Sequence, residues 1–454
     1  MNSNYQFPAG FRWGAASAAL QVEGSPNAEN GGVSTWQTLY QRPGAIVGDG
    51  DLGRACEHFK RFRDDVRLMK ELGISDYRFS IAWPRVFPEG DGTPNPRGLD
   101  FYQQLIDELL DNGITPWVTM FHWETPQALE DRWGGWRDKR TAHKLADYVS
   151  YVVPRISDRV KDFFTVNEIG CFTAGGYGTG SDGFPPALKC EAQVVNQTIY
   201  NGCLAHGLTV QAIRAAAIGP VEIGIADNPG AFTPLIATQE NIEACKQAFV
   251  SRAGSILTLI MEGRHREEYL RQVGDAAPVF TEDELKVIHE PLDFLGLNIY
   301  HGHEVVADAS APEGYRMIAK PVSFPKLDMP WLDFTPSCTY WTLRFIHELW
   351  RPRKIFVSEN GAACIDKINP DDGEIYDSDR ILFINNYLDQ IHRAIAEGVP
   401  VKGYFYWSLM DNLEWRWGEA KRFGLYYVNF KTQKRILKQS GKYYREIIRR
   451  NALI

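Results

Sequence analysis

The chain contains the stretch DFFTVNEIG at residues 162–170, in which a short apolar run ends in an amide and a carboxylate, Asn167 and Glu168. A run of this length and composition, followed by polar residues and a glycine, is typical of a buried β-strand that opens into a loop. The stretch KIFVSENG at residues 354–361 repeats the pattern and ends in Glu359 and an Asn-Gly turn. Two buried strands in different halves of the chain therefore each present a carboxylate at the carboxyl end.

Further segments have the composition of buried strands, and helical segments separate them. The predicted strands are 11–16, 76–81, 115–121, 162–166, 222–227, 293–299, 354–358 and 402–407. Apolar residues recur at helical spacing in 98–112 and, less regularly, in 55–72. Gly73, Gly113 and Gly398 each end a helical segment just before a strand. Eight strand-then-helix units without a break in composition predict the α/β class. We expect a single (β/α)8 TIM barrel domain over residues 1–454, with elaborated βα loops at its C-terminal face.

The alternative fold is an open, doubly wound sheet, which usually needs fewer strands and a glycine-rich phosphate-binding turn after the first strand. A Gly-x-Gly-x-x-Gly string does occur, at Gly178, Gly180 and Gly183. However, no strand leads directly into it, and Phe-Pro-Pro follows where a helix should begin. We interpret the string as a flexible loop near the end of the fourth strand, which favours the barrel.

The composition excludes several classes of function. A chain of 454 residues with 44% hydrophobic residues can build a large core, and its net charge of −8 with no basic stripe does not favour nucleic acid as a partner. There is no apolar run of membrane-spanning length and no signal-like start, so we expect no membrane partner. The seven cysteines form no Cys-x-x-Cys pair, which is typical of a reducing compartment. We therefore expect a cytoplasmic protein.

If the barrel forms, the carboxyl ends of its strands share one face. Nearly every predicted strand ends in polar or indole side chains, namely Gln21, Glu23, Arg78, His122, Trp123, Asn167, Glu168, Asn298, Tyr300, Glu359, Trp407, Asp411, Asn412, Glu414 and Trp415. Taken singly, such residues are more often loop hydrogen-bonders or core aromatics. Together they predict a sugar pocket, because sugar hydroxyls need donors and acceptors and the apolar ring face needs an aromatic platform.

The two strand-end carboxylates indicate the chemistry. A lone glutamate after a strand is more often a helix cap, but a pair held on rigid strand ends is what glycosidic bond cleavage needs. Retention of the anomeric configuration requires one neutral and one ionised carboxyl about 5 to 5.5 Å apart. We therefore expect the two carboxyl groups to have different pKa values, and hence a bell-shaped pH profile with its optimum below or near neutrality.

Seven strings extend the pattern over nearly the whole chain: ALQVEG, YRFSIAWPRV, GLDFYQQLIDELLDNGITPWVTMFHW, TVNEIG, FLGLNIY, VSENG and GYFYWSLMDNLEWRWGEAKRFGL. In this order they closely resemble glycoside hydrolase family 1, the β-glucosidase family of retaining enzymes. The similarity runs from about Phe7 to the C-terminal helix. The resemblance implies a TIM barrel and an O-glycosyl hydrolase.

The resemblance also implies a role for each site residue. Glu168 matches the family's acid/base, and Glu359 matches its nucleophile. Arg78 and Tyr300 match the pair that orients the nucleophile and keeps it ionised. The positions that match sugar-contacting residues are Gln21, His122, Trp123, Asn167, Asn298, Trp331, Trp407, Glu414, Trp415 and Phe423. No cofactor or metal is implied, and the His301-Gly302-His303 run is interpreted as structural or pocket-lining.

The activity implied is that of a retaining exo-β-glucosidase, which hydrolyses terminal nonreducing β-D-glucosyl residues of short oligosaccharides or of aryl and alkyl glucosides. β-Galactosides and β-fucosides are the expected side substrates. Glu414 would repel a phosphorylated sugar, and a glutamate instead of glutamine at position 168 is typical of O-glycosidases. Two alternatives stay open, a transglycosylase using the same site and a noncatalytic sugar-binding relative. The expected partner is a small carbohydrate. The sequence does not decide between a monomer and a homo-oligomer.

Three features depart from the family pattern. Ile169 replaces the proline of Asn-Glu-Pro, Glu124 replaces the aspartate of His-Trp-Asp, and residues 178–186 differ from the common loop. Loss of the proline frees φ and restores a backbone N–H, so we expect the Glu168 loop to be placed differently or to be more mobile. These departures bear on leaving-group specificity and on the balance between hydrolysis and transfer.

Overall fold

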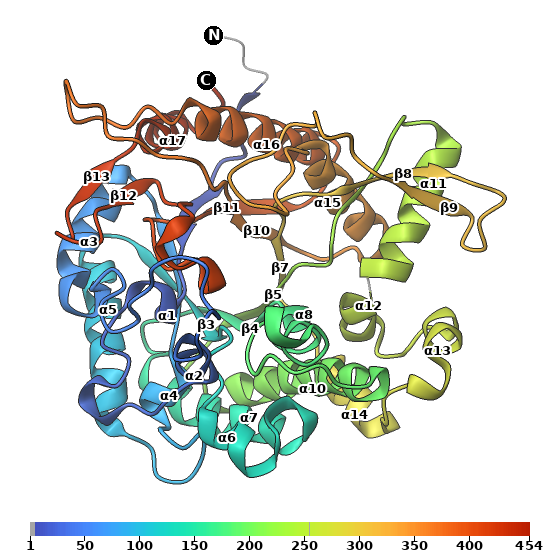
Figure 1. Cartoon of the computed structure of the whole chain (residues 1–454), viewed down its shortest axis with the longest axis horizontal. Coiled ribbons are helices and arrows are strands. Elements are labelled where there is room, and N and C mark those ends of the chain that lie inside the picture. The colour runs from blue at the N-terminus through green and yellow to red at the C-terminus, as the bar shows by residue number, and fades with distance from the viewer. Residues whose placement is uncertain (1–4, 254) are drawn as a thin grey trace.

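The computed structural model describes residues 5–253 and 255–454, and its centre is a closed barrel of parallel strands (Figure 1). Around the barrel, β1 pairs with β11 and β2, and the remaining order is β3, β4, β5, β7 and β10. The bounds are β1 Arg12–Ala16, β2 Asp76–Ser80, β3 Thr115–Phe121, β4 Asp162–Asn167, β5 Glu222–Asp227, β7 Phe294–Asn298, β10 Ile355–Asn360 and β11 Val401–Trp407. Every predicted strand is present and no end differs from the prediction by more than about two residues. The TIM barrel is confirmed, and the open sheet was the wrong alternative.

Aromatic side chains from several strands fill the interior of the barrel. Trp117 is the centre of this layer, with its ring 4.8 to 5.7 Å from the rings of Phe164, Phe294, Phe356 and Phe405. Gly296 makes room for the Phe164 ring, because a Cβ at position 296 would lie 2.5 Å from that ring. The guanidinium of Arg78 lies 4.7 Å from the centre of the same ring. The aromatic layer therefore packs against the guanidinium of Arg78.

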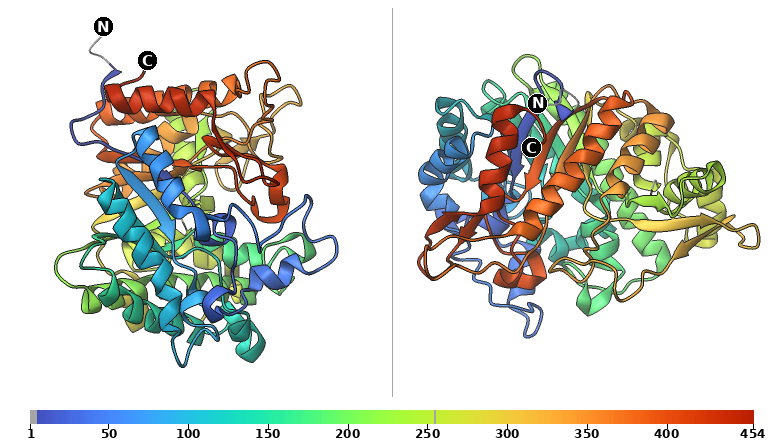
Figure 2. Two further views of the ribbon diagram at one scale, coloured as in Figure 1. Left: turned by 90° about the vertical axis from the view of Figure 1, so that its left-hand side faces the viewer. Right: turned by 90° about the horizontal axis from the view of Figure 1, so that it is seen from above.

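Helices surround the barrel, as Figures 1 and 2 show. The longer ones are α3 His58–Leu72, α5 Asp100–Asp111, α7 Arg140–Val152, α10 Ala192–Ala216, α15 Ser337–Trp350, α16 Ser378–Ala396 and α17 Gln439–Arg450. The helix predicted over 55–72 begins three residues later, because Glu57 is in the left-handed region with φ 51°. Gly73 has φ 84° and Gly398 has φ 92°, which a glycine adopts freely, so both end their helices as predicted.

The loops after the strands carry most of the additional structure. They contain the short helices α1 Ala19–Val22, α2 Thr35–Tyr40, α4 Trp83–Val86, α6 Gln127–Trp133, α8 Ile169–Phe172, α9 Ala174–Tyr177, α11 Gln239–Ala248, α12 Ser255–Glu262, α13 Glu267–Val273 and α14 Glu282–Ile288. Two small sheets join them, β6 Phe232–Pro234 with β8 His303–Ala307 and β9 Tyr315–Ile318, and β12 Tyr426–Val428 with β13 Arg435–Leu437. The glycine string at 178–183 lies between α9 and α10, so it is a loop after the fourth strand.

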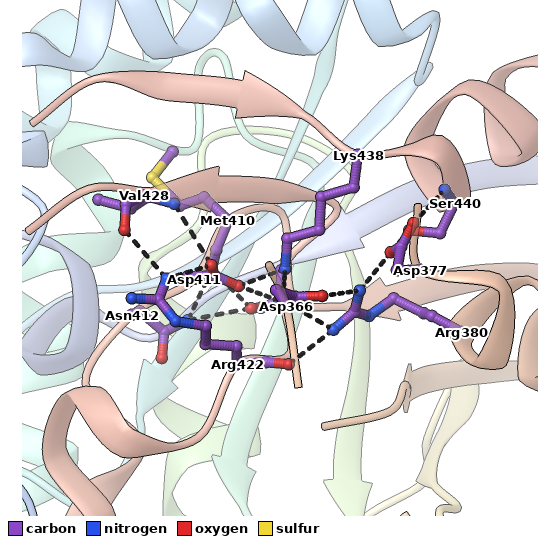
Figure 3. A network of polar contacts seen from close by, with 12 residues as sticks. Asp366, Asp377, Arg380, Met410, Asp411, Asn412, Arg422, Val428, Lys438 and Ser440 are labelled. Atoms are coloured by element: carbon purple, nitrogen blue, oxygen red, sulfur yellow. Dashed lines mark hydrogen bonds and ion pairs between the residues drawn. The ribbon is translucent and has the colours of Figure 1, made fainter. Parts of the chain in front are cut away.

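A buried network of charged side chains holds the loop after β11 (Figure 3). Asp411 accepts hydrogen bonds from Arg422 Nη1 at 2.7 Å and from Lys438 Nζ at 2.6 Å. Lys438 Nζ also donates to Asp366 at 2.6 Å, and Asp366 accepts a further bond from Arg380 at 3.0 Å. These side chains come from the segments that follow β10 and β11, from α16 and from the residue before α17. The network therefore ties two loops of the C-terminal face to the outer helices.

The two ends of the described chain lie side by side, as both views in Figure 2 show. The backbone N–H of Phe7 donates to the carbonyl of Asn451 at 2.9 Å, and Gln6 forms a β-bridge with Ala452. All seven cysteines have free thiols. Within the described part of the chain, no helix has both the length and the apolar character needed to cross a membrane.

Candidate active site

A cavity of about 440 Å³ opens at the carboxyl ends of the barrel strands. Of the site residues predicted from the sequence, it is lined by His122, Trp123, Glu168, Asn298, Tyr300, Trp331, Glu359, Trp407, Glu414, Trp415 and Phe423. Gln21, Arg78 and Asn167 are buried beside the cavity. Arg78 donates to Glu359, Asn167 accepts from Asn298, and Gln21 donates to the carbonyl of Leu413, the residue before Glu414. His301 and His303 also line the cavity, as predicted. The fold thus brings these residues together. Three others that the strand-end pattern predicted for the pocket, Glu23, Asp411 and Asn412, do not line it: Glu23 pairs with Arg85, Asp411 belongs to the charge network of Figure 3, and Asn412 accepts a hydrogen bond from Gln21.

Glu359 sits at the carboxyl end of β10 and is held by two donors. Arg78 Nη1 donates to its Oε1 at 2.6 Å, and the Tyr300 hydroxyl donates to its Oε2 at 2.8 Å. The carboxylate and the guanidinium are both buried, so little water competes for this ion pair. Both carboxylate oxygens therefore have fixed positions, with a cation on one of them.

Glu168 follows β4 directly and adopts a left-handed backbone conformation with φ 46°. Its Oε1 accepts a hydrogen bond from Asn298 Nδ2 at 2.7 Å. Its Oε2 lies 3.1 Å from Asn228 Nδ2 and 3.0 Å from Cys171 Sγ. In contrast to Glu359, none of these contacts is to a cation.

Asn298 and Asn167 join the surroundings of the two carboxyl groups into one network. Asn298, which is opposite Glu359 in the β7–β10 register, accepts from Ser358 Oγ at 2.7 Å and donates to Asn167 Oδ1 at 3.1 Å. Arg78 Nη2 donates to the same Asn167 oxygen at 2.6 Å. Because each amide is anchored on a strand end, the network fixes Glu168 relative to Glu359.

Burial raises the pKa of both glutamates, but the neighbours act in opposite directions. The pKa of Glu168 rises to about 8, first because of burial and then because of the negative charge of Glu359. Burial also raises the pKa of Glu359, whereas the Arg78 guanidinium and the Tyr300 hydroxyl oppose the rise. These opposing neighbours favour ionisation of Glu359 over ionisation of Glu168, which is the difference that a pair of one anionic and one neutral carboxyl group needs.

The inner end of the cavity combines aromatic rings with free polar atoms. The imidazole of His122 lies nearly parallel to Trp407 and Trp415, with ring centres 5.8 and 5.7 Å apart. Gln21 Oε1, Glu414 Oε2 and His122 Nδ1 are buried and have no hydrogen-bond partner among the described residues. Buried polar atoms are normally paired, so this end suits a ligand rich in hydroxyl groups. Burial, followed by the charges of the two glutamates, raises the pKa of Glu414 to about 8.

The outer end of the cavity is more apolar and opens to solvent. Trp331 is 40% exposed there and packs edge-on against Tyr300, with ring centres 5.7 Å apart. Phe184 and Met329 also line the cavity. This end suits a flat or apolar group attached to the molecule that fills the inner end.

Asn228 and Cys171 were not among the predicted site residues, although both line the cavity. Asn228 directly follows the predicted fifth strand, the one strand whose end had contributed no candidate residue, and its position was a usable signal. Cys171 lies one helical turn beyond Glu168 in α8, and no pattern in the sequence singles it out.

The residues that the structure describes contain no group of three or more His, Cys, Asp or Glu side chains placed to hold a metal ion. The polar atoms of the cavity, two carboxyl groups surrounded by amides, a guanidinium and indoles, are instead suited to proton transfer and covalent chemistry on a neutral, hydroxylated ligand.

Comparisons with known proteins agree with this picture. The model of glycosyl hydrolase family 1 matches residues 3–453. The chain is 39% identical to β-glucosidase A of Thermotoga maritima over 452 residues, 99% of each chain, and 36% identical to a bifunctional β-D-glucosidase/β-D-fucosidase of Bifidobacterium breve over 97% of this chain and 98% of that one. A solved structure of the Thermotoga maritima β-glucosidase in complex with isofagomine lactam superposes with a TM-score of 0.90 and 37% identity, covering 99% of this chain and 100% of that one.

Proposed function

The chain belongs to glycosyl hydrolase family 1 and is a retaining β-glucosidase, and from this premise we propose that Glu359 is its nucleophile and Glu168 its acid/base. The observation that supports this assignment best is the contrast between two carboxyl groups in one cavity. Glu359 has a guanidinium on Oε1, whereas Glu168 has only neutral partners. A retaining site needs this difference, because the nucleophile must be an anion while the other group still carries its proton.

In the first step, Glu359 attacks the anomeric carbon and the bond to the leaving oxygen breaks. The proton of Glu168 passes to that oxygen, so the aglycone departs as a neutral alcohol. Arg78 and Tyr300 keep Glu359 ionised and fix the direction of its attack. Asn298 holds Glu168 beside the leaving oxygen through its 2.7 Å hydrogen bond.

In the second step, Glu168 acts as a base. Once Glu359 is esterified to the sugar its negative charge is gone, so the charge that helped to raise the pKa of Glu168 disappears. Glu168 then takes a proton from a water molecule, and the water oxygen attacks the anomeric carbon and releases Glu359. The sugar leaves with the β configuration that it had in the substrate.

The inner end of the cavity supports binding of one nonreducing sugar. The free atoms of Gln21, His122 and Glu414 are placed to pair with its hydroxyl groups, and the indoles of Trp407 and Trp415 offer it an apolar face. Trp123 and Phe423 line the cavity around it. We assign Trp331, at the open end, to the aglycone.

We propose a short β-glucoside as the preferred substrate. We also propose that residues 1–454 form a single catalytic domain. Side activity on β-fucosides is supported by the bifunctional Bifidobacterium breve relative. We extend the proposal to β-galactosides because Gln21 Oε1 and Glu414 Oε2 are both free acceptors at the inner end of the cavity. The free thiols of all seven cysteines suit a reducing compartment, which supports a cytoplasmic location.

The product anomer and one pair of variants test the assignment. We expect the protein to hydrolyse an aryl β-glucoside and to release β-glucose first, as followed by NMR. In Glu359→Ala, kcat should be more than about 10⁴-fold lower than in the wild type. In Glu268→Ala, which changes an exposed glutamate outside the cavity, kcat should equal that of the wild type. First release of α-glucose, or an active Glu359→Ala, would overturn the assignment. Glycosylated acceptors as the main product would instead favour the transglycosylase.

A further inference from the structure

Two side chains meet at one oxygen of Glu168, its Oε2. Cys171 Sγ lies 3.0 Å from Oε2, and Asn228 Nδ2 lies 3.1 Å from the same oxygen and 3.6 Å from Sγ. Cys171 belongs to α8, whose first turn follows Glu168, and its backbone N–H donates to the Glu168 carbonyl at 2.9 Å. The thiol is therefore fixed to the same turn as the carboxyl group that it contacts.

The other oxygen of Glu168 has a partner that can only donate. Asn298 Oδ1 accepts from Ser358 Oγ at 2.7 Å, which fixes the orientation of the amide and points its NH2 group at Oε1. Oε1 is thus always the acceptor, and in a neutral carboxyl group the carbonyl oxygen is the stronger acceptor. Oε2 also faces an amide NH2 group, that of Asn228, but at 3.1 Å instead of 2.7 Å, and this group has Cys171 Sγ as a second acceptor. The geometry therefore favours Oε2, the oxygen next to the thiol, as the site of the Glu168 proton.

A partner of Oε2 has to suit two states, because Glu168 is a neutral acid in one step of the reaction and an anion in the other. At Oε2, an amide NH2 group is a suitable partner only while this oxygen is ionised. A thiol suits both states, because it can accept a hydrogen bond through sulfur or donate one through S–H. Asn228 can donate to either Oε2 or Sγ from its present position. The pair can therefore satisfy both states without a change of rotamer.

We propose that Cys171 is a positioning residue for the acid/base. Its sulfur accepts a hydrogen bond from the Oε2 hydroxyl while Glu168 is neutral, and its S–H donates a hydrogen bond to Oε2 once Glu168 is ionised. The inference rests on the role proposed above for Glu168. No proton is transferred to or from sulfur, since the Glu168 proton goes to the leaving oxygen and the S–H only reorients. Burial and the neighbouring Glu168 hold the pKa of the Cys171 thiol well above its ordinary value, so the thiol stays protonated.

The remaining charges around Glu168 set the direction of the effect. Glu359 and Asp227 raise its pKa, Glu414 and the Tyr300 hydroxyl are also nearby, and the donors Asn298 and Cys171 lower it. Loss of the thiol removes a donor to the anion and a weak sulfur acceptor from the neutral acid. The bond to the charged form is the stronger of the two, so the pKa of Glu168 should rise further. The base form needed for the second step then becomes scarcer at a given pH.

The first test compares Cys171→Ala, Cys171→Ser and, as a matched control, Cys190→Ala, which removes a partly buried thiol outside the cavity. In Cys171→Ala we expect the alkaline limb of kcat/KM for an alkyl β-glucoside to move up by about half a pH unit. For a dinitrophenyl β-glucoside, whose departure needs no acid, kcat should fall by up to about threefold at a pH below the pKa of the base. Cys171→Ser should restore both values, since a hydroxyl also donates and accepts. Profiles of Cys171→Ala that superpose on the wild type would overturn the proposal.

The second test does not depend on turnover. The infrared difference between the wild type and Cys171→Ala isolates the S–H band of one thiol, which should shift as Glu168 titrates and should stay constant in Glu168→Gln. A band that does not move with pH in the wild type would overturn the proposal. If the band moves but the wild type cleaves no β-glucoside, the contact is supported and the proposed function is what fails.

Discussion

At the scale of single residues, the site depends on giving two identical side chains different partners. Arg78 and Tyr300 come from β2 and from the end of β7 to meet Glu359, while amides and a thiol meet Glu168. The sequence predicts both carboxylates because each follows an apolar strand, and the resemblance to the family supplies their roles. It does not predict which hydrogen bonds form, since Asn298, Asn167 and Arg78 lie far apart along the chain.

Tyr300→Phe tests the control of the nucleophile. Loss of a hydrogen bond to a charged group weakens stabilisation of the Glu359 anion by about 1.5–3 kcal/mol, so the pKa of Glu359 should rise. The acid limb of the kcat/KM profile on an aryl β-glucoside should then move up by about one pH unit or more, and kcat/KM should fall at least about tenfold. Arg78 remains in place, so activity should not vanish. An acid limb unchanged by the substitution would contradict this role for Tyr300.

At the scale of elements, the strands were predictable and the small sheets were not. Most barrel strands are rich in apolar residues because both of their faces are buried, although β2, DYRFS, also buries polar and charged residues. In contrast, β6 and β12 have three residues each, too few for any period, and β8, HEVVA, is only partly buried. The loops that hold Asn228 and Cys171 take their shape from contacts with other loops, and a local pattern does not encode such contacts.

The buried charge network around Asp411 makes an element-scale prediction. In Lys438→Met, Asp366 and Asp411 both lose a buried 2.6 Å partner, which should cost about 3–5 kcal/mol of unfolding free energy. Chemical denaturation measures this loss. The matched control is Lys442→Met, four residues along, which removes a partly exposed ion pair with Glu374 and should cost less than about 1 kcal/mol. Equal losses in the two variants would show that the network adds no stability.

At the scale of the whole molecule, many titratable groups are buried in their neutral forms. Burial raises the pKa of Glu124, Glu168 and Glu414 to about 8 and that of Asp162 and Asp227 to about 7. It also lowers the pKa of several histidines, to about 3 for His206 and about 4 for His265 and His301. The carboxyl groups make the folded state bind more protons than the unfolded chain, and the histidines make it bind fewer.

These shifts predict how stability depends on pH. Between about pH 4.5 and 6.5 the carboxyl and histidine contributions oppose one another. Above pH 6.5 the unfolded histidines are neutral as well, and only the carboxyl groups still contribute. The unfolding free energy should then fall from pH 6.5 to 8, by up to about 1.4 kcal/mol per pH unit for each such group. Urea denaturation at several pH values measures this slope, which should be shallower in Glu168→Gln/Glu414→Gln. Stability that rises over this interval would contradict the assignment.

The pairing of β1 with β11 has a consequence for how the enzyme is made. A ribosome extends a chain by about 5–20 residues per second, so the first strand waits roughly 20–80 s for its second neighbour. During that time the nascent sheet has an open edge. Glu359 is made only in the last part of this interval, and Glu414 follows β11. Each new molecule thus gains its catalytic power only in the last moments of translation, when the final strands close the ring.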